Sequence, residues 1–359
     1  MHTVRPIGIS FLDPDHVVRL GRSLLAWDGD EDRTYVRDFF LPEVVDEAEL
    51  AGAGAPLREA HRLRVASFGD EAALRDAEVL VFRRGRIDAG VLARAPRLKF
   101  IQRIGASSHP IDLQATRERG IAVSCLPRPT LVHVAEHAML LMLALSRRLL
   151  DCDRAVRAGG PAVGVPGKEY YNWANIGGLS LLAGRTLGIA GYGEIGQLLA
   201  RRASGFGMRI ICADRKTLDP TQHADAGIQQ VPFTDLLRSA DFVSVHVPPL
   251  PDGRPLIGVS ELASMKPTAF LINIARGLLV DEDHLYDALV EGRIAGAGLD
   301  VHTREPRGPG DRLASLANVV LTPHMAGGSR RGVLDEMTAI FANIGDALAG
   351  HAPRHARVA

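Results

Sequence analysis

The 359-residue sequence is poor in several features that define whole classes of protein. It has three cysteines, Cys125, Cys152 and Cys212, which lie far apart and form no CxxC motif. An odd number of scattered cysteines provides no disulfide framework and is typical of a reducing compartment. We therefore expect a cytoplasmic protein rather than a disulfide-rich secreted one, with Cys212 as a buried thiol beside Ile210 and Ile211.

Neither sign of charge is in excess, because 42 Lys and Arg balance 42 Asp and Glu. A neutral chain has no bulk field that attracts nucleic acid or an anionic membrane, so neither is expected as a partner. The longest apolar run, Ala138 to Leu145, is far shorter than the roughly 20 residues that cross a bilayer. We expect it to form part of a buried helix. No signal peptide is indicated at the N-terminus.

The length is that of two domains, each with its own core. In the first third, short apolar segments alternate with helical ones. The apolar segments are Ile7–Leu12, Glu78–Phe82, Leu98–Ile104 and Ile121–Cys125, and the helical ones are Ile87–Ala95 and Ile111–Arg119. This alternation predicts a parallel sheet covered on both faces. Residues Asp13 to Leu63, with a Gly/Ala-rich stretch at Ala51–Pro56, are interpreted as an excursion from this domain.

A second alternation follows a break at Pro127–Pro129. A long helix is predicted at Val132–Leu149, and Gly159–Gly184 is interpreted as a loop or arm, whose aromatic residues suggest contact with a partner subunit. Six strands are then predicted at Thr186–Ala190, Arg209–Ala213, Asp241–Val247, Ala269–Ile274, Ala295–Val301 and Asn318–Thr322. Six strands separated by helices are the number in a doubly wound dinucleotide-binding sheet.

A glycine-rich turn follows the first of these strands. Gly191, Gly193 and Gly196 form a GxGxxG motif that leads from an apolar strand into a helix at Glu194–Ala203, the context that a pyrophosphate site requires. Gly191 permits a tight turn, Gly193 a close approach of the pyrophosphate, and Gly196 close packing of helix on strand. The helix N-terminus then offers free N–H groups to phosphate. The alternative is a turn that binds nothing.

An acidic residue stands where a dinucleotide site needs one. Asp214 ends the next strand, about 20 residues on, where a carboxylate accepts hydrogen bonds from ribose hydroxyls. A carboxylate there repels a 2′-phosphate, so NAD is favoured over NADP. Arg215 and Lys216 follow directly and could accept that phosphate, which leaves NADP open.

Three further polar residues lie just beyond the carboxyl ends of later strands: Arg276, Glu305 and His324. Reduction of a 2-keto acid needs a proton donor, which histidine supplies because its ordinary pKa of about 6.5 lies near neutrality. Glu305 is assigned to hold the imidazole, and Arg276 to bind the substrate carboxylate and polarise the carbonyl. Singly, each could be a surface ion-pair residue, a loop acid or a structural histidine; together, they favour an active site.

With these residues in place, the chain resembles the D-isomer-specific 2-hydroxyacid dehydrogenase family, which includes D-3-phosphoglycerate and D-lactate dehydrogenases and glyoxylate/hydroxypyruvate reductases. The resemblance covers roughly Leu98 to Gly332. Besides the glycine turn, the matching strings are Val134–His137, Phe206–Met208, His246–Pro248, Asn273–Gly277, Gly298–Val301 and Pro323–His324.

The resemblance implies the fold, the site and the assembly. It implies a Rossmann NAD-binding domain at 129–322 inserted into a discontinuous flavodoxin-like substrate domain at 1–128 and 323–359, both doubly wound α/β, in a homodimer that meets at the arm. Arg276, Glu305 and His324 become the catalytic set, and Asp300 holds the nicotinamide carboxamide. Residues expected at the cofactor are Gly191, Gly193, Glu194, Ile195, Gly196, Asp214, His246, Pro248, Ile274, Asp300, Arg276 and His324.

Several positions depart from the family pattern. The substrate-carboxylate loop, usually Gly-x-Gly-x-Asp, is here Gly105-Ala106-Ser107-Ser108-His109, and Gly253 replaces a common phosphate-side threonine. Gly105 and Ala106 are still assigned to the substrate. Arg84, in the basic segment Arg83–Arg86, matches a position that binds an anionic tail, although a solvated basic loop is equally compatible with the sequence. These departures leave the substrate's identity open.

The sequence thus predicts an NAD-dependent D-2-hydroxyacid dehydrogenase that needs no metal and acts on a small anionic 2-keto or 2-hydroxy acid. Its site is expected between two domains hinged near residues 128 and 322, where closure would exclude water. One alternative is phosphite-type oxidation. Formate oxidation is disfavoured, because by resemblance those enzymes carry glutamine in place of Glu305. Another alternative is an NAD(H)-sensing binding protein on the same fold.

Overall fold

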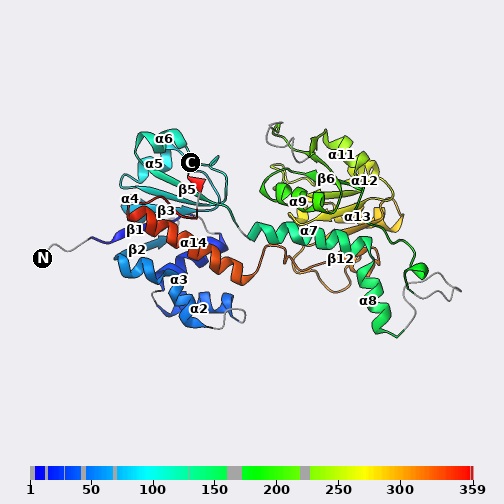
Figure 1. Ribbon diagram of the computed structural model, residues 1–359, viewed down its shortest axis with the longest axis horizontal. Coiled ribbons are helices and arrows are strands. Elements are labelled where there is room, and N and C mark those ends of the chain that lie inside the picture. Colours follow the sequence, from blue (N-terminus) through cyan, green and yellow to red (C-terminus); the bar gives the residue numbers. More distant parts are fainter. Residues whose placement is uncertain are drawn as a thin grey trace. The chain divides into compact units, whose positions relative to one another are not determined.

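The computed structural model describes residues 5–12, 15–27, 29–41, 46–67, 71–128, 130–159, 172–218, 227–355 and 357–358. The chain forms two compact units (Figure 1). The first comprises Met1–Thr130 together with Gly328–Ala359, and the second comprises Leu131–Gly327. The first unit is therefore built from both ends of the chain.

The first unit contains a six-stranded sheet. Its elements are β1 (Ile7–Phe11), α1 (His16–Ala26), α2 (Asp30–Phe40), α3 (Glu47–Ala60), β2 (Leu63–Ser67), α4 (Glu71–Asp76), β3 (Ala77–Phe82), α5 (Ala89–Arg94), β4 (Phe100–Ile104), α6 (Leu113–Glu118), β5 (Ala122–Leu126), α14 (Arg330–Leu348) and β13 (Arg357–Val358). The order is β13-β5-β4-β3-β1-β2, in which β1 to β5 are parallel and β13 is antiparallel to β5. The five parallel strands have the flavodoxin order.

Each face of this sheet is covered by its own set of helices. Helices α1, α2, α3 and α14 bury one face with side chains such as Leu24, Leu50 and Met337. Helices α5 and α6 cover the opposite face through Leu92 and Leu113, which pack with Val123 of β5. Figure 1 shows α5 and α6 on one side of the strands and α3 and α14 on the other. A parallel sheet covered in this way explains why β3 is buried along its whole length and is apolar at every residue except Glu78.

The interpretation of residues 13–63 as an excursion from the first domain is wrong. This segment folds into α1, α2 and α3, which connect β1 to its parallel neighbour β2 and supply much of the core, including Leu20, Val36 and Leu57. The Gly/Ala-rich stretch lies inside α3 with Pro56. Glycine and proline are unfavourable inside a helix, but the burial of Leu50 and Leu57 against the core outweighs this cost.

The second unit contains a seven-stranded, wholly parallel sheet. Its elements are α7 (Thr130–Ser146), α8 (Leu149–Arg157), η1 (Asn172–Asn175), β6 (Thr186–Ala190), α9 (Glu194–Gly205), β7 (Arg209–Ala213), β8 (Gln229–Gln230), α11 (Phe233–Ser239), β9 (Phe242–Val245), α12 (Val259–Ser264), β10 (Phe270–Asn273), η3 (Gly277–Leu279), α13 (Glu282–Val290), β11 (Gly296–Leu299), η4 (Leu313–Ser315) and β12 (Val319–Leu321). The order β12-β11-β10-β9-β6-β7-β8 is the Rossmann order with one added edge strand.

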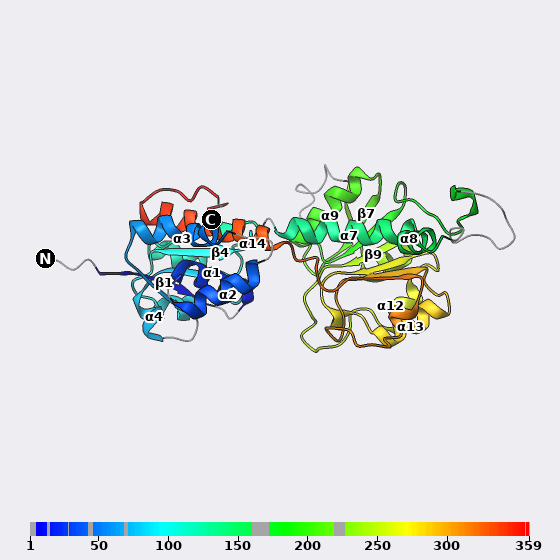
Figure 2. The same ribbon diagram turned by 90° about the horizontal axis from the view of Figure 1, so that it is seen from below.

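Helices cover both faces of this sheet as well. Helices α7 and α9 lie on one face, and α12 and α13 lie on the other (Figure 2). The apolar run from Ala138 to Leu145 lies within α7, where Leu141 and Met142 are fully buried. The two α/β sheets confirm the predicted fold class.

Two details of the second unit differ from the sequence prediction. The helix predicted at Val132–Leu149 ends at Ser146, because Arg148 adopts a left-handed conformation (φ 49°) and a separate helix, α8, begins at Leu149. The sheet also gains β8, whose two glutamines carry no apolar signal. Tyr170 and Tyr171 of the predicted arm lie outside the described residues, whereas Trp173 is exposed.

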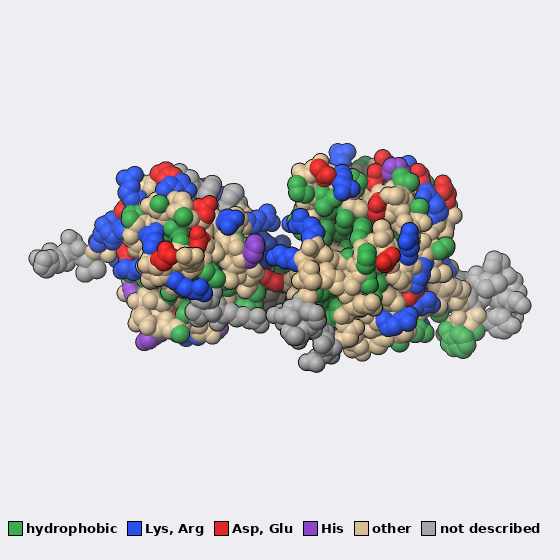
Figure 3. All heavy atoms as spheres, turned by 90° about the horizontal axis from the view of Figure 1, so that it is seen from above, with side chains coloured by type: hydrophobic (Ala, Val, Ile, Leu, Met, Phe, Trp, Pro, Cys, Tyr) green, Lys and Arg blue, Asp and Glu red, His purple; other side chains and the backbone are tan. Residues whose placement is uncertain are grey.

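The surface carries both signs of charge. On the face shown in Figure 3, Lys and Arg are interspersed with Asp and Glu on both units. Within the described ranges, no helix is long and apolar enough to span a membrane. The same residues contain no cluster of three or more His, Cys, Asp or Glu side chains suited to a metal ion.

A buried ion pair joins the two chain segments of the first unit. Arg128 Nε donates to Glu336 Oε1 at 2.8 Å, and the Glu336 side chain is 0% exposed. We expect Arg128→Met to lower the free energy of unfolding of this unit by about 3–5 kcal/mol, because it leaves the buried Glu336 carboxylate without its partner. Urea unfolding followed by Trp27 fluorescence, with Trp173 replaced by Phe throughout, measures this.

Two controls accompany that experiment. The double variant Arg128→Met/Glu336→Met removes both charges and should recover most of the lost stability. Arg331→Met breaks the exposed pair with Glu49 and should change stability by less than about 1 kcal/mol. Equal effects of Arg128→Met and Arg331→Met would contradict the assignment of the buried pair.

Candidate active site

The glycine turn lies where the strand order of the second sheet reverses. Gly191 follows β6 with φ 97°, and a Cβ there would lie 2.7 Å from Val247 Cγ1 and 2.8 Å from the His246 carbonyl oxygen. The backbones after β6 and β9 therefore touch, and only glycine fits both the conformation and the contact. Ligands of open α/β sheets bind outside the carboxyl ends of the strands at such a reversal.

The start of α9 is open to a ligand. Gly193 is the N-cap and provides no side-chain cap, and a Cβ there would meet nothing within 4 Å. Gly196 packs tightly, since its Cβ would lie 2.5 Å from the Gly191 carbonyl oxygen. Glu194 and Ile195 are half-buried in the first turn. The backbone N–H groups of this turn and the positive end of the helix dipole suit a phosphate group.

Asp214 stands beside the glycine turn. Its carboxylate accepts hydrogen bonds from the backbone N–H of Tyr192 at 2.8 Å and of Lys216 at 3.0 Å, so it is fixed between the turn and the end of β7. Each carboxylate oxygen has further lone pairs for a ribose hydroxyl. Arg215 and Lys216 are exposed. Burial and the charge of Asp214 raise the pKa of the Cys212 thiol to about 11, as suits a buried, unreactive thiol.

The remaining residues predicted at the cofactor occupy the ends of β9 and β10. His246 Nε2 lies 2.8 Å from Ser244 Oγ, and burial lowers the pKa of His246 to about 3. The imidazole is therefore neutral at physiological pH. Pro248 is exposed, whereas Ile274 is buried after β10.

Glu305 and His324, 19 residues apart, meet as a pair. His324 Nδ1 lies 2.7 Å from Glu305 Oε2, and the other Glu305 oxygen accepts the His302 backbone N–H at 2.9 Å. Burial alone would raise the pKa of Glu305, but the hydrogen bonds from His324 and His302 hold it below its ordinary value. Because Nδ1 faces the carboxylate, Nε2 is the nitrogen left for a substrate. The His324 side chain is 43% exposed, which gives a ligand access.

A buried carboxylate shapes the turn that carries His324. Asp300, 0% exposed, accepts hydrogen bonds from Thr322 Oγ1 at 2.6 Å and from the backbone N–H groups of Met325 and Ala326, both at 2.9 Å. The His324 N–H donates to the Asp300 carbonyl oxygen at 2.8 Å, and His324 adopts φ 55°. Asp300 thus holds this turn, and its contact with the nicotinamide carboxamide stays a prediction.

His137 supports the same turn from α7. Its Nε2 lies 2.9 Å from Thr322 Oγ1, and since that hydroxyl donates its hydrogen to Asp300, His137 Nε2 is the donor here. His137 belongs to the string Val134–His137 that matches the family, but its support of this turn was not predicted. The role of Thr322 was not predicted either, since its one signal is its place directly before Pro323 and His324.

Arg276 follows β10 on the neighbouring strand end. The buried Asn273 side chain donates to the Arg276 carbonyl oxygen at 2.9 Å and accepts the Ala275 N–H at 3.1 Å, which fixes the turn. Gly277 lies flush against the next loop, since a Cβ there would fall 2.0 Å from the His302 carbonyl carbon. The Arg276 guanidinium donates to the Ala275 carbonyl oxygen at 2.5 Å and is exposed. Arg276 therefore adjoins the Glu305 loop through backbone contact, not through an ion pair.

The predicted substrate residues of the first unit follow β3 and β4. Asp15 lies between Arg83, at 2.7 Å, and Arg84, at 3.2 Å, and the Arg84 side chain is 60% exposed. Burial by itself would raise the pKa of Asp15, but Arg83 and Arg84 hold it below its ordinary value. Gly105, with φ 143°, donates to the Leu126 carbonyl oxygen.

Comparison with known proteins agrees with these features. Residues 139–326 match the model of the D-isomer specific 2-hydroxyacid dehydrogenase family, NAD binding domain. A glyoxylate reductase of Korarchaeum cryptofilum is 41% identical over 256 residues, which are 70% of this chain and 74% of that protein. A D-3-phosphoglycerate dehydrogenase of Mycobacterium leprae is 37% identical over 78% of this chain, but the match spans only 51% of that longer protein.

A solved structure extends the likeness over nearly the whole chain. The crystal structure of a glyoxylate reductase from Paecilomyes thermophila matches with a TM-score of 0.60 and 27% identity, over 97% of this chain and 98% of that one. The chain thus belongs to the D-isomer specific 2-hydroxyacid dehydrogenase family and is an NAD-dependent oxidoreductase of 2-hydroxy acids.

Proposed function

We propose that His324 is the acid/base of this reaction, with Glu305 as its partner and Arg276 as the ligand of the substrate carboxylate. The contact between His324 Nδ1 and Glu305 Oε2 carries the proposal. A carboxylate with a lowered pKa stays ionised at neutral pH and stabilises an imidazolium beside it. This arrangement supports proton transfer at the other ring nitrogen.

The chain's residues act in sequence on a bound 2-keto acid. Bound NADH supplies the hydride that reaches C2. As the carbonyl becomes an alkoxide, His324 Nε2 gives its proton to that oxygen, and the product is the (R)-2-hydroxy acid. In the reverse direction, neutral His324 takes the hydroxyl proton. Glu305 is charged throughout and fixes the ring by its contact with Nδ1.

Arg276 and the glycine turn hold the reactants in this proposal. The exposed Arg276 guanidinium offers a planar fork to the substrate carboxylate and carbonyl oxygens. The N–H groups behind Gly193 take the pyrophosphate, and Asp214 takes the ribose hydroxyls of NAD. The fixed Asp214 carboxylate disfavours a 2′-phosphate, despite the exposed Arg215 and Lys216.

The first unit is the substrate domain in this proposal, and the second is the cofactor domain. Gly105 and Ala106 would lie beside the substrate carboxylate, and Arg84 would meet an anionic tail. The exposure of the Arg84 side chain beside Asp15 supports the latter. The names of the relatives make glyoxylate and 3-phosphoglycerate the first substrates to test. We further propose a reducing compartment such as the cytoplasm, since the three cysteines form no disulfide.

We also propose that the protein is a homodimer that meets through α8. This helix has no buried residue and exposes Leu149 and Val156 along one stripe, with Trp173 and Leu181 exposed further along the chain. A hollow beside it, lined in part by Leu150, Phe270 and Val320, is largely apolar. An amphipathic helix without a buried face needs a partner for that face.

The acid/base role has a direct test. His324→Ala should lower kcat for glyoxylate reduction by about 10²- to 10⁴-fold, because the alkoxide loses its proton donor. NADH affinity, measured by the quenching of protein fluorescence, should change by less than about threefold. Retention of normal turnover by His324→Ala would refute the role of His324.

A substrate panel separates the alternatives. Parent protein assayed with NADH should reduce glyoxylate, hydroxypyruvate or a related 2-keto acid, or oxidise the matching hydroxy acids with NAD. NADH binding with no turnover of any keto acid would instead favour a nucleotide sensor. NAD reduction by phosphite alone would favour phosphite oxidation.

The dimer is tested by Val156→Asp. A charge in an apolar interface is costly, so this variant should elute with the mass of a monomer at micromolar concentration in size exclusion with light scattering. Val290→Asp, at an exposed valine of α13, makes the same change on another helix; it is the matched control and should remain dimeric. A parent protein that is itself monomeric would rule the proposal out.

A further inference from the structure

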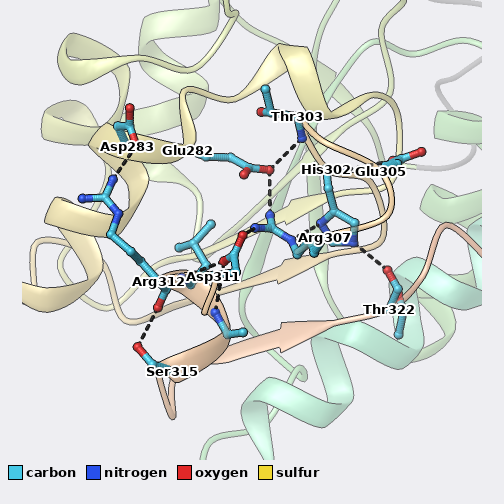
Figure 4. Close-up of polar contacts among 12 residues, drawn as sticks. Glu282, Asp283, His302, Thr303, Glu305, Arg307, Asp311, Arg312, Ser315 and Thr322 are labelled. Atoms are coloured by element: carbon cyan, nitrogen blue, oxygen red, sulfur yellow. Dashed lines mark hydrogen bonds and ion pairs between the residues drawn. The ribbon is translucent and has the colours of Figure 1, made fainter. Parts of the chain in front are cut away.

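The loop between β11 and η4 is held by one nearly buried arginine (Figure 4). The Arg307 side chain is 12% exposed, and each of its three guanidinium nitrogens donates a hydrogen bond. Nε donates to His302 Nδ1 at 2.7 Å. Its two terminal nitrogens donate to Glu282 Oε1 at 2.7 Å and to Asp311 Oδ2 at 2.5 Å. Arg307 thus ties this loop to α13, and no part of the proposed reaction uses it.

These contacts fix the protonation of His302. Arginine only donates, so His302 Nδ1 must accept and carries no hydrogen. The hydrogen therefore lies on Nε2, which donates to the Thr322 carbonyl oxygen at 2.8 Å. His302 is buried, neutral and confined to one tautomer, and it joins the end of β11 to the end of β12.

His302 leads directly to the acid/base pair. Its backbone N–H donates to Glu305 Oε1 at 2.9 Å, and Glu305 Oε2 lies 2.7 Å from His324 Nδ1. Glu282, the acceptor of Arg307, also accepts the Thr303 N–H at 3.0 Å. The short segment from His302 to Glu305 is therefore restrained by its own backbone and by the Arg307 fork.

We propose that Arg307 is a positioning residue: through His302 it holds Glu305 in the orientation that serves His324. This inference rests on the proposed role of the Glu305–His324 pair. Arg307 itself touches neither member of that pair among the described contacts. It acts by keeping His302 neutral and stationary, so that one Glu305 oxygen is anchored and the other stays on His324.

The effect on pH dependence has two contributions of opposite sign. The packed elements carry several titratable and charged groups. They are His302, Arg304, Glu305, Arg307, Asp311 and Arg312 on the loop, Glu282 and Asp283 on α13, Asp300 after β11, Arg276 after β10, and His324 after β12. Removing one positive charge would by itself favour the His324 imidazolium and move the basic limb of reduction to higher pH. Losing the orientation of Glu305 would move that limb to lower pH.

The experiment compares the pH profile of kcat/KM for glyoxylate reduction among variants of the full-length protein. Arg307→Met should lower kcat by between about 10- and 100-fold, a range typical of misplaced catalytic groups, with little change in NADH affinity. Its basic limb should move to lower pH, toward the limb of Glu305→Gln. The basic limb of the double variant Arg307→Met/Glu305→Gln should lie at no lower pH than that of Glu305→Gln alone, because both changes remove the same interaction.

The controls separate positioning from charge and from stability. Arg307→Lys keeps the positive charge but cannot make all three hydrogen bonds, so its basic limb should also move to lower pH. If Arg307→Met does not fold, Arg307→Lys takes its place in the comparison. Arg312→Met breaks the exposed pair with Asp283 on the same loop and should keep the parent profile. A limb that stays in place or moves up in a folded Arg307 variant overturns the inference. Normal turnover by His324→Ala would instead overturn the proposed function.

Discussion

The carboxylate of Asp300 is the constraint on which the rest of the site depends. It is fully buried, and the cost of burying it is offset by a hydroxyl and two backbone N–H groups that donate to it, with His137 Nε2 3.4 Å away. Those donors belong to the turn after β12, so satisfying the charge forces that turn into one shape. The left-handed conformation of His324 is part of this shape, and it presents the imidazole to Glu305.

Four histidines lie at this edge of the sheet, and the groups around each one determine what it can do. His246 is neutral because burial lowers its pKa, and His302 because an arginine occupies its Nδ1. His137 donates to the Thr322 hydroxyl, which in turn donates to Asp300. His324, in contrast, pairs with a carboxylate and is open to ligands. Residue type alone does not distinguish these four, whereas their partners do.

The sequence predicted the sheets well where the pattern was local. The strands β6 and β7 were placed to the residue, because each is a short apolar run bounded by turn residues. The glycine turn, and the meeting of Glu305 with His324, followed from the positions of these residues after strands. The helices at residues 13–63 were missed because their stability comes from burial against α14, which is almost 300 residues away along the chain.

The supporting residues could not be predicted for a related reason. Arg307 and Thr322 look like ordinary loop residues, and their importance arises from partners on other elements, such as Glu282 on α13 and His137 on α7. No spacing rule connects residues across a sheet edge. Asp300 was assigned to the cofactor by resemblance, whereas its contacts with the turn become visible only once the strands are assembled.

The first unit's construction from both chain ends bears on how the protein is made. On the ribosome, β1 to β5 emerge before the second unit, but α14 and β13, which cover one face and one edge of their sheet, are synthesised after it. The continuous second unit can complete its core before then. Until α14 has been synthesised, the first unit exposes the apolar surface that Met337 and Ile340 later cover. Nascent chains are therefore vulnerable to aggregation at this face, and chaperone binding is expected there rather than on the nucleotide-binding half.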